Sequence, residues 1–80
     1  MTNTKFNGHK NWNCWNVSLW LNNDEYLYRM MLSFCKAYKS KTAAALQMLY
    51  ELQNEGIYKT PDGAPYSASS IVLAMRGLEA

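Results

Sequence analysis

The chain has 80 residues, of which 49% are hydrophobic and 18% are charged, and its formal net charge is +2. This length predicts one domain, and the apolar fraction is too high for a disordered chain. The positive charge excess is below that of a typical nucleic-acid-binding protein. The three Trp, six Tyr and two Phe bring large apolar area to a small core. Dimerisation stays open as a second source of stability for a chain of this size.

The first ten residues are polar, and no apolar segment of the kind found in signal peptides follows them. No apolar run reaches the roughly 20 residues that a membrane-spanning helix needs. We therefore expect a flexible N-terminal arm over 1–10 and a single helical domain over 11–80. We also expect a cytoplasmic location, which is the host cytoplasm for a phage-encoded protein, and no membrane partner.

A first helix is predicted from residue 12 onward, with Asn11 or Asn13 as its N-cap. Trp12, Trp15 and Leu19 share one face at helical spacing, and further apolar residues make the helix apolar nearly all round. Such a helix is usually buried on several sides. The second and third tryptophans are therefore expected in the core, whereas the first, near the helix start, is expected to be partly exposed.

The polar run over 22–25 ends this helix, and Asn23 is predicted to cap a second one. Asp24 and Glu25 would then lie in its first turn, where the helix dipole favours negative charge. The apolar stripe of the second helix consists of Leu27, Met30, Met31 and Phe34.

Thr42 is predicted to cap a third helix that runs from Ala43 to about Glu55. Gly56 follows at the position where a left-handed residue commonly ends a helix, and Ile57 would complete the hydrophobic contact that accompanies this ending. The inward face of the third helix is expected to consist of Ala45, Leu46, Leu49 and Leu52.

Residues 58–66 contain Pro61-Asp62-Gly63, which favours a turn because proline presets φ and glycine accepts a positive φ. The flanking residues are expected to form a tiny β-hairpin. Ser67 then caps a fourth helix. The fold class is predicted to be mainly α, a compact bundle of four short helices with a small hairpin or turn between the last two. The inward residues of the fourth helix are Ile71, Ala74, Met75 and Leu78.

No catalytic or metal site is predicted. The adjacent carboxylates at 24–25 point in different directions on a helix and cannot share one reacting atom. The serines at 67–70 have no histidine near them and no nucleophile-elbow glycines. Cys14, Cys35 and His9 lack the spacing of zinc ligands, and both cysteines are expected to be buried thiols in a reducing compartment. We expect no enzymatic activity and no cofactor.

Cations concentrate between Arg29 and Lys41, where no acidic residue occurs. A solvated helix end followed by a loop would explain them, because cations stabilise helix C-termini. The alternative is a patch that binds a phosphate backbone or an acidic protein.

Residues 12–25 read W-N-C-W-N-V-S-L-W-L-N-N-D-E, a long and tryptophan-rich string. It resembles the W-x-x-W-N-V-x-L-W-x-x-N-D-E pattern of a family of small uncharacterised proteins of phages, plasmids and bacterial genomes. The resemblance implies a phage or other mobile-element origin. Small phage proteins of this size are often accessory factors that bind and block host machinery, including CRISPR and other defence complexes.

Residues 52–71 are similar to the helix–hairpin–helix stretch in the DNA-binding region of large serine recombinases, which resembles L-N-x-x-G-I-x-T-P-x-G-x-x-W-S-x-S-T-V-R-R. Where that pattern has two arginines, this chain has Val72 and Leu73. Arginines contact phosphates and base edges, whereas aliphatic side chains contact little beyond thymine methyl groups. The pair is therefore expected to be buried elsewhere or exposed as an apolar patch, which would indicate a protein interface.

The sequence thus predicts a non-enzymatic phage or mobile-element accessory protein that binds and inhibits a host protein or ribonucleoprotein complex, with anti-CRISPR-like action as the sharpest version. Aromatic and arginine side chains are favoured at interfaces. The predicted protein contacts are Trp12, Tyr26, Tyr58, Tyr66, Val72, Leu73 and Arg76.

Two other functions stay open. One is a small DNA-binding regulator of the helix-turn-helix type, whose affinity would fall steeply with salt. The other is a structural component that assembles with copies of itself. For the DNA-binding alternative, the predicted phosphate contacts are Lys36, Lys39, Lys41, Lys59 and Arg76.

Overall fold

The structure is a computed structural model that describes residues 11–78. The prediction of a mainly α bundle with four helices is confirmed, and within these residues the only β pairing is one isolated bridge. The arm predicted over 1–10 lies outside the described residues. The helices are α1 (Trp12–Asn23), α2 (Glu25–Ala37), α3 (Lys41–Asn54) and α4 (Ala68–Gly77).

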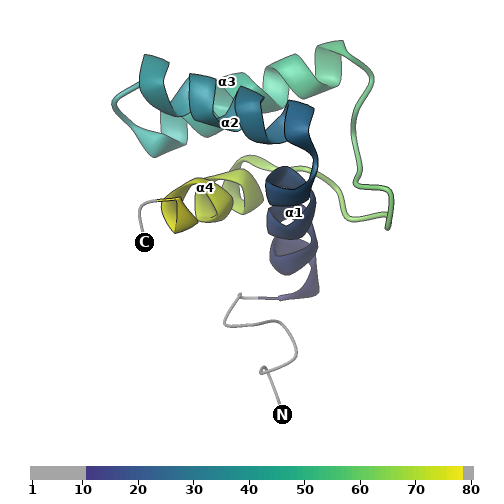
Figure 1. Ribbon diagram of the computed structural model, residues 1–80. Coiled ribbons are helices and arrows are strands. Elements are labelled where there is room, and N and C mark those ends of the chain that lie inside the picture. The colour runs from purple at the N-terminus through teal and green to yellow at the C-terminus, as the bar shows by residue number, and fades with distance from the viewer. Residues whose placement is uncertain (1–10, 79–80) are drawn as a thin grey trace.

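Each helix packs against two others. Helices α2 and α3 run side by side in opposite directions and form one layer, with α1 and α4 crossing each other beneath them (Figure 1). Helix α4 packs against α3 and α1, and α1 also packs against α2. The segment from α3 to α4 passes α1 at one end of the molecule, and the α2–α3 loop lies at the other end (Figure 1).

Side-chain caps define the helix starts. Asn11 accepts a hydrogen bond from the amide of Cys14, which confirms one of the two predicted caps of α1. The predicted cap of α2 was wrong, because Asn23 is the last residue of α1 and Asp24 accepts from the amide of Leu27 at 3.0 Å. Neighbouring Asn and Asp residues are equally good caps, so the pattern does not decide between them.

The start of α3 was also predicted too late. Ser40, not Thr42, is the N-cap, and its hydroxyl accepts from the amide of Ala43 at 3.2 Å. The end of α3 was predicted correctly. Gly56 has φ +77°. The amide of Ile57 donates to the carbonyl of Leu52 at 2.8 Å, which is the 6→1 hydrogen bond of a Schellman motif.

The predicted turn and hairpin are present. The amide of Gly63 donates to the carbonyl of Thr60 at 2.9 Å, and Gly63 has φ +99°. Lys59 and Pro65 form a single antiparallel bridge beyond the turn. This turn followed by a left-handed glycine is a common three-residue hairpin loop.

Helix α4 begins and packs as predicted. The hydroxyl of Ser67 accepts from the amide of Ser70, and the hydroxyl of Ser70 accepts from the amide of Ser67, which forms a reciprocal capping box. Ile71 and Met75 are fully buried, and Leu78 is half-buried. The serines at 67–70 are therefore occupied by helix capping.

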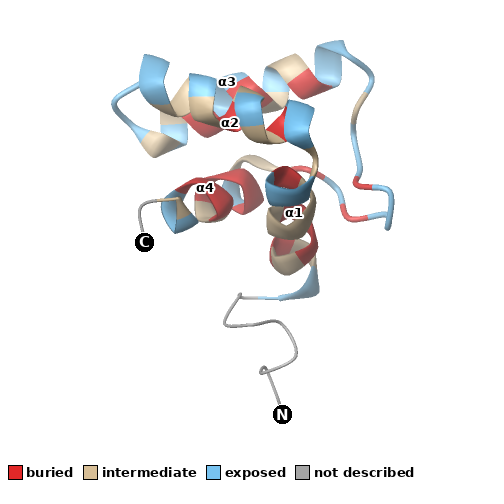
Figure 2. Ribbon diagram, in the orientation of Figure 1, coloured by how far each residue is buried: buried red, intermediate tan, exposed pale blue. Residues whose placement is uncertain are grey.

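The core lies between the two layers and draws on all four helices and the hairpin (Figure 2). Two expectations about it were wrong. Trp15 and Trp20 are half-buried at its edge, because Val17 and Leu21 hold the inward positions of α1. Leu46 is 38% exposed, and the inward positions of α3 beside Ala45 and Leu52 are held by Ala44 and Met48.

Both errors have the same physical cause. Helix α1 is apolar nearly all round and α3 has apolar residues on more than one face, so periodicity does not single out the inward face. The inward positions are set by how the helices pack, with Val17 and Leu21 in α1 and Ala44 and Met48 in α3. The indoles lie at the edge, where they have room.

Candidate functional site

A network of hydrogen bonds joins α1 to the hairpin. Asn16 is 1% exposed, and its side-chain amide donates to Oδ2 of Asp62 at 2.9 Å. The amide oxygen of Asn16 accepts from the hydroxyl of Thr60, which in turn accepts from the amide of Ala64 at 3.0 Å. Nε1 of Trp20 donates to the same Asp62 oxygen at 2.9 Å.

The network stabilises the charged form of Asp62. Hydrogen bonds from Asn16 and from Trp20 lower the pKa of this carboxyl below its usual value, in that order of importance. The arrangement contains a carboxylate, two amide groups and a hydroxyl that satisfy one another. Because Asn16 and Trp20 belong to α1 whereas Thr60 and Asp62 belong to the hairpin, the network holds the hairpin against α1.

A hollow lies over the outer face of α4, which we call the α4 hollow. It has a volume of about 440 Å³. Val72 and Leu73 form an apolar wall, and Arg76 is the cation at its edge. The lining residues of the α4 hollow are Thr42, Ala68, Ser69, Val72, Leu73 and Arg76.

The structure divides the residues predicted for protein binding into separate surfaces. Val72, Leu73 and Arg76 meet in the α4 hollow. Tyr26 and Tyr66 line a second hollow beside Trp20. Two further predicted contacts, Trp12 and Tyr58, are exposed but line neither hollow.

Two of these residues are less accessible than a binding contact requires. Tyr66 is 7% exposed and Val72 is 9% exposed, because both belong to the core cluster. Tyr66 follows the hairpin directly, and the docked hairpin carries its ring inward. The two alternatives expected for the pair Val72 and Leu73 therefore divide between its members. Val72 is buried in the core, whereas Leu73 is half-buried on the outer face of α4.

The predicted DNA contacts do not form one surface. Lys36 and Lys39 are exposed at the end of α2 and in the loop after it, and Lys41 begins α3. Arg76 lies near them, since it shares the α4 hollow with Thr42. Lys59 belongs to the hairpin at the opposite end of the molecule (Figure 1).

Several residues of these surfaces were not identified from the sequence. Ala68 lies four residues before Val72 and Ser69 four residues before Leu73, so helical spacing would have found both. Thr42 would not have been found, because its place in the hollow depends on how α3 packs against α4. Tyr38 and Tyr50 are further exposed aromatic residues.

The described part of the chain offers no other chemical centre. Within residues 11–78 there is no group of three or more His, Cys, Asp or Glu side chains that could hold a metal ion. Cys14 is buried and Cys35 is half-buried, and no disulfide joins them. None of the described helices has the length and apolar character required to span a membrane.

Comparison with known proteins identifies a family without a known activity. No curated protein and no solved structure matches the chain. Residues 2–78 match the family described as "Family of unknown function (DUF7249)", which covers α1, the hairpin contact and the α4 hollow. The chain therefore belongs to the DUF7249 family.

Proposed function

We propose that the protein is a non-enzymatic accessory factor that binds another protein through the α4 hollow. The observation that supports the proposal is the meeting of Leu73, Val72 and Arg76 over one concave face. Arginine is enriched at protein interfaces, and an exposed apolar surface beside it gains from being covered by a partner. The matching partner surface is an apolar side chain with a carboxylate beside it that pairs with Arg76.

The same face is poorly suited to DNA. Arg76 is the one cation among the described residues that line the α4 hollow, whereas a DNA-reading helix presents several phosphate and base contacts. Of the predicted phosphate contacts, Lys59 lies at the opposite end of the molecule from Lys36, Lys39 and Arg76, so the full set cannot contact one stretch of DNA backbone together. Binding to duplex DNA is therefore expected to be weak and readily lost with added salt.

The resemblance of residues 12–25 to proteins of phages and plasmids extends the proposal. It supports an accessory factor of a mobile element that acts in the host cytoplasm by blocking a host complex, with anti-CRISPR-like inhibition as the sharpest version. In this reading Leu73 and Arg76 would form the centre of the inhibitory contact.

Affinity capture tests the proposal. The tagged full chain is incubated with lysate of the proposed bacterial host, treated with nuclease and washed at low and then high salt. Leu73→Glu is the test variant because it places a charge on the apolar wall of the α4 hollow. Gln53→Glu, at an exposed position near the other end of α3, is the matched control with the same change of charge.

The proposal predicts one protein complex that the wild type and Gln53→Glu retain at high salt and that Leu73→Glu loses. The captured complex is then purified and assayed for loss of its activity when the protein is added. Recovery of nucleic acid only, released by high salt, would overturn the proposal in favour of DNA binding. Equal capture by Leu73→Glu would show that another surface binds.

A further inference from the structure

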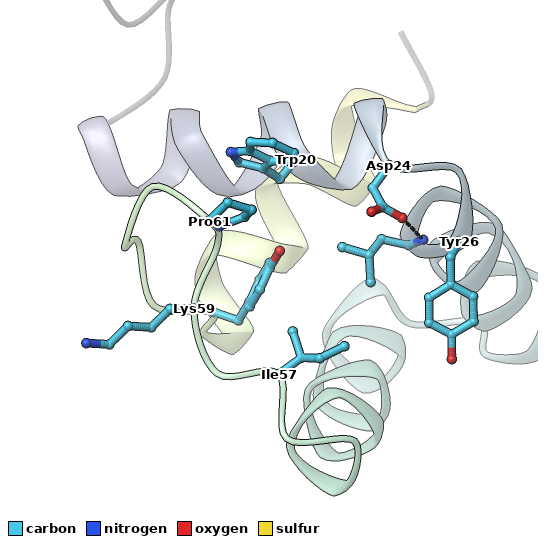
Figure 3. Close-up of a pocket in the computed structure, with 8 residues that line it drawn as sticks. Trp20, Asp24, Tyr26, Ile57, Lys59 and Pro61 are labelled. Carbon is cyan, nitrogen blue, oxygen red and sulfur yellow. Dashed lines mark hydrogen bonds between the residues drawn. The ribbon is translucent and has the colours of Figure 1, made fainter.

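A second hollow lies where the α1–α2 corner faces the hairpin, and we call it the corner pocket. Its volume is about 280 Å³. Figure 3 shows Trp20 and Pro61 on one side of it and Ile57 below, and Leu27 completes the apolar wall. The volume lies below the roughly 300–1,000 Å³ of pockets that take drug-sized ligands. The corner pocket therefore suits one side chain or a very small molecule.

Two polar atoms at the wall of the corner pocket, the hydroxyl of Tyr66 and Oδ2 of Asp24, have no hydrogen bond within residues 11–78. Tyr66 is 7% exposed, and no hydrogen bond of its hydroxyl is present within residues 11–78. Asp24 uses Oδ1 to cap α2 through the amide of Leu27, while its Oδ2 has no hydrogen bond (Figure 3). Buried polar groups are nearly always satisfied, so an unpartnered phenol in a pocket points to a ligand.

Asp24 brings a negative charge, unpaired within residues 11–78, to the wall of the corner pocket. Lys59 contributes its aliphatic stem, but Figure 3 shows its amine directed away from Asp24. The hydroxyl of Tyr26 is engaged elsewhere, since it donates to Glu55 at 2.7 Å. No ion pair neutralises Asp24 within the described residues. An occupant with a positive charge would complete the site.

We propose that the corner pocket binds one alkylammonium or guanidinium group on a short apolar stem, the chemistry of a lysine or arginine side chain. The cation would donate to Oδ2 of Asp24 and to the hydroxyl of Tyr66. The stem would pack against Ile57 and Leu27, and the ring of Trp20 would add a cation–π attraction. The group can belong to a free amine or to a residue of a bound peptide.

Titration by NMR tests this proposal on the full chain. The probes are n-butylguanidinium, n-butylammonium, the peptide analogue N-acetyl-arginine-N-methylamide and the uncharged n-pentanol. The indole N–H of Trp20 and the backbone amides of Leu27 and Lys59 report on occupancy, because all three residues line the pocket. A tighter fit of the peptide analogue than of butylguanidinium would indicate a peptide as the source of the cation.

Two variants separate binding from folding. Asp24→Asn removes the charge but keeps a good N-cap for α2, and it is expected to weaken cation binding at least about tenfold, as loss of a charge-assisted bond implies. Tyr66→Phe is expected to weaken binding about threefold without loss of thermal stability, because the deleted hydroxyl has no partner. Glu25→Gln is the control, since this neighbouring carboxylate pairs with Arg29 outside the pocket.

The proposal is supported if the cations bind saturably, pentanol does not, and only Asp24→Asn and Tyr66→Phe reduce the affinity. Absence of saturable shifts with every cation would overturn it. So would equal binding of pentanol, or an Asp24→Asn variant that binds as well as Glu25→Gln.

Discussion

The side-chain amide of Asn16 donates a hydrogen bond to Oδ2 of Asp62, a residue 46 positions later, at 2.9 Å. The bond joins the two stretches that stand out in the sequence, the tryptophan-rich string of α1 and the turn of the hairpin. Trp20 adds a second bond to the same oxygen. Because the hairpin leads directly into α4, the contact also holds the segment from which that helix begins.

Removal of the Asn16 side chain should destabilise the fold. Asn16→Ala leaves the buried hydroxyl of Thr60 without its acceptor, and an unsatisfied buried polar group costs about 1–3 kcal/mol. For a domain of this size each kcal/mol lowers the melting temperature by about 4–8 °C. Calorimetry should show this loss. Asn22→Ala, at an exposed position of the same helix, should change the melting temperature little, and equal effects of the two changes would contradict the account.

The contact of Asp62 should depend on pH. The folded-state pKa lies below the usual 3.8, first because of Asn16 and then because of Trp20. The unfolded chain therefore binds a proton more readily, so the contribution to stability is present above pH 3.8 and is lost as the pH falls through the folded-state pKa. Denaturant unfolding should show a gap between wild type and Asp62→Asn that is widest near neutral pH and narrows in acid. A gap that is constant over pH would show that the charge of Asp62 plays no part.

The cap of α3 offers a paired test. Ser40→Ala removes the hydroxyl that accepts from the amide of Ala43, and loss of such a cap costs about 0.5–2 kcal/mol. Thr42→Ala, inside the helix and exposed, should change the free energy of unfolding by no more than about 0.5 kcal/mol. A larger loss of stability from Thr42→Ala than from Ser40→Ala would place the start of α3 at Thr42, as predicted from the sequence.

Two glycines should respond oppositely to alanine. Gly56 has φ +77° and Gly77 lies in the last turn of α4, and an added Cβ meets no atom within 4 Å at either position. The difference is therefore one of backbone conformation. Gly56→Ala should lower the free energy of unfolding by about 1 kcal/mol, whereas Gly77→Ala should leave it unchanged or raise it by up to about 1 kcal/mol. Stabilisation by Gly56→Ala would contradict the left-handed helix ending.

The local elements could be read from the sequence because their signals are local. Gly56 after a helical run and Pro61-Asp62-Gly63 between apolar segments each require one backbone conformation, and the structure has both. Ser67 is likewise a cap with its partner Ser70 only three residues away. Where two cap residues stand close together, as with Asn23 and Asp24, local chemistry does not choose between them.

The tertiary arrangement could be predicted only in part. Trp20 was expected in the core, but its Nε1 needs a hydrogen-bond partner, and Asp62 supplies one at the surface. The pairing of these residues spans 42 positions and depends on how the hairpin docks. Val72 and Leu73 stand out in the sequence as a departure from the recombinase pattern, whereas Thr42 meets them in the α4 hollow only through the packing of α3 on α4.

The central claim is that the α4 hollow binds a protein, and the most direct measurement is the Kd of the purified partner from the capture experiment. Titration calorimetry compares wild type, Leu73→Glu and Gln53→Glu at low and high salt. The account predicts that Leu73→Glu weakens binding about 30-fold or more, which is the effect of about 2 kcal/mol at an interface centre, and that Gln53→Glu binds as the wild type does at both salt concentrations. Equal affinities of all three proteins, or binding that disappears with salt for the wild type, would contradict it.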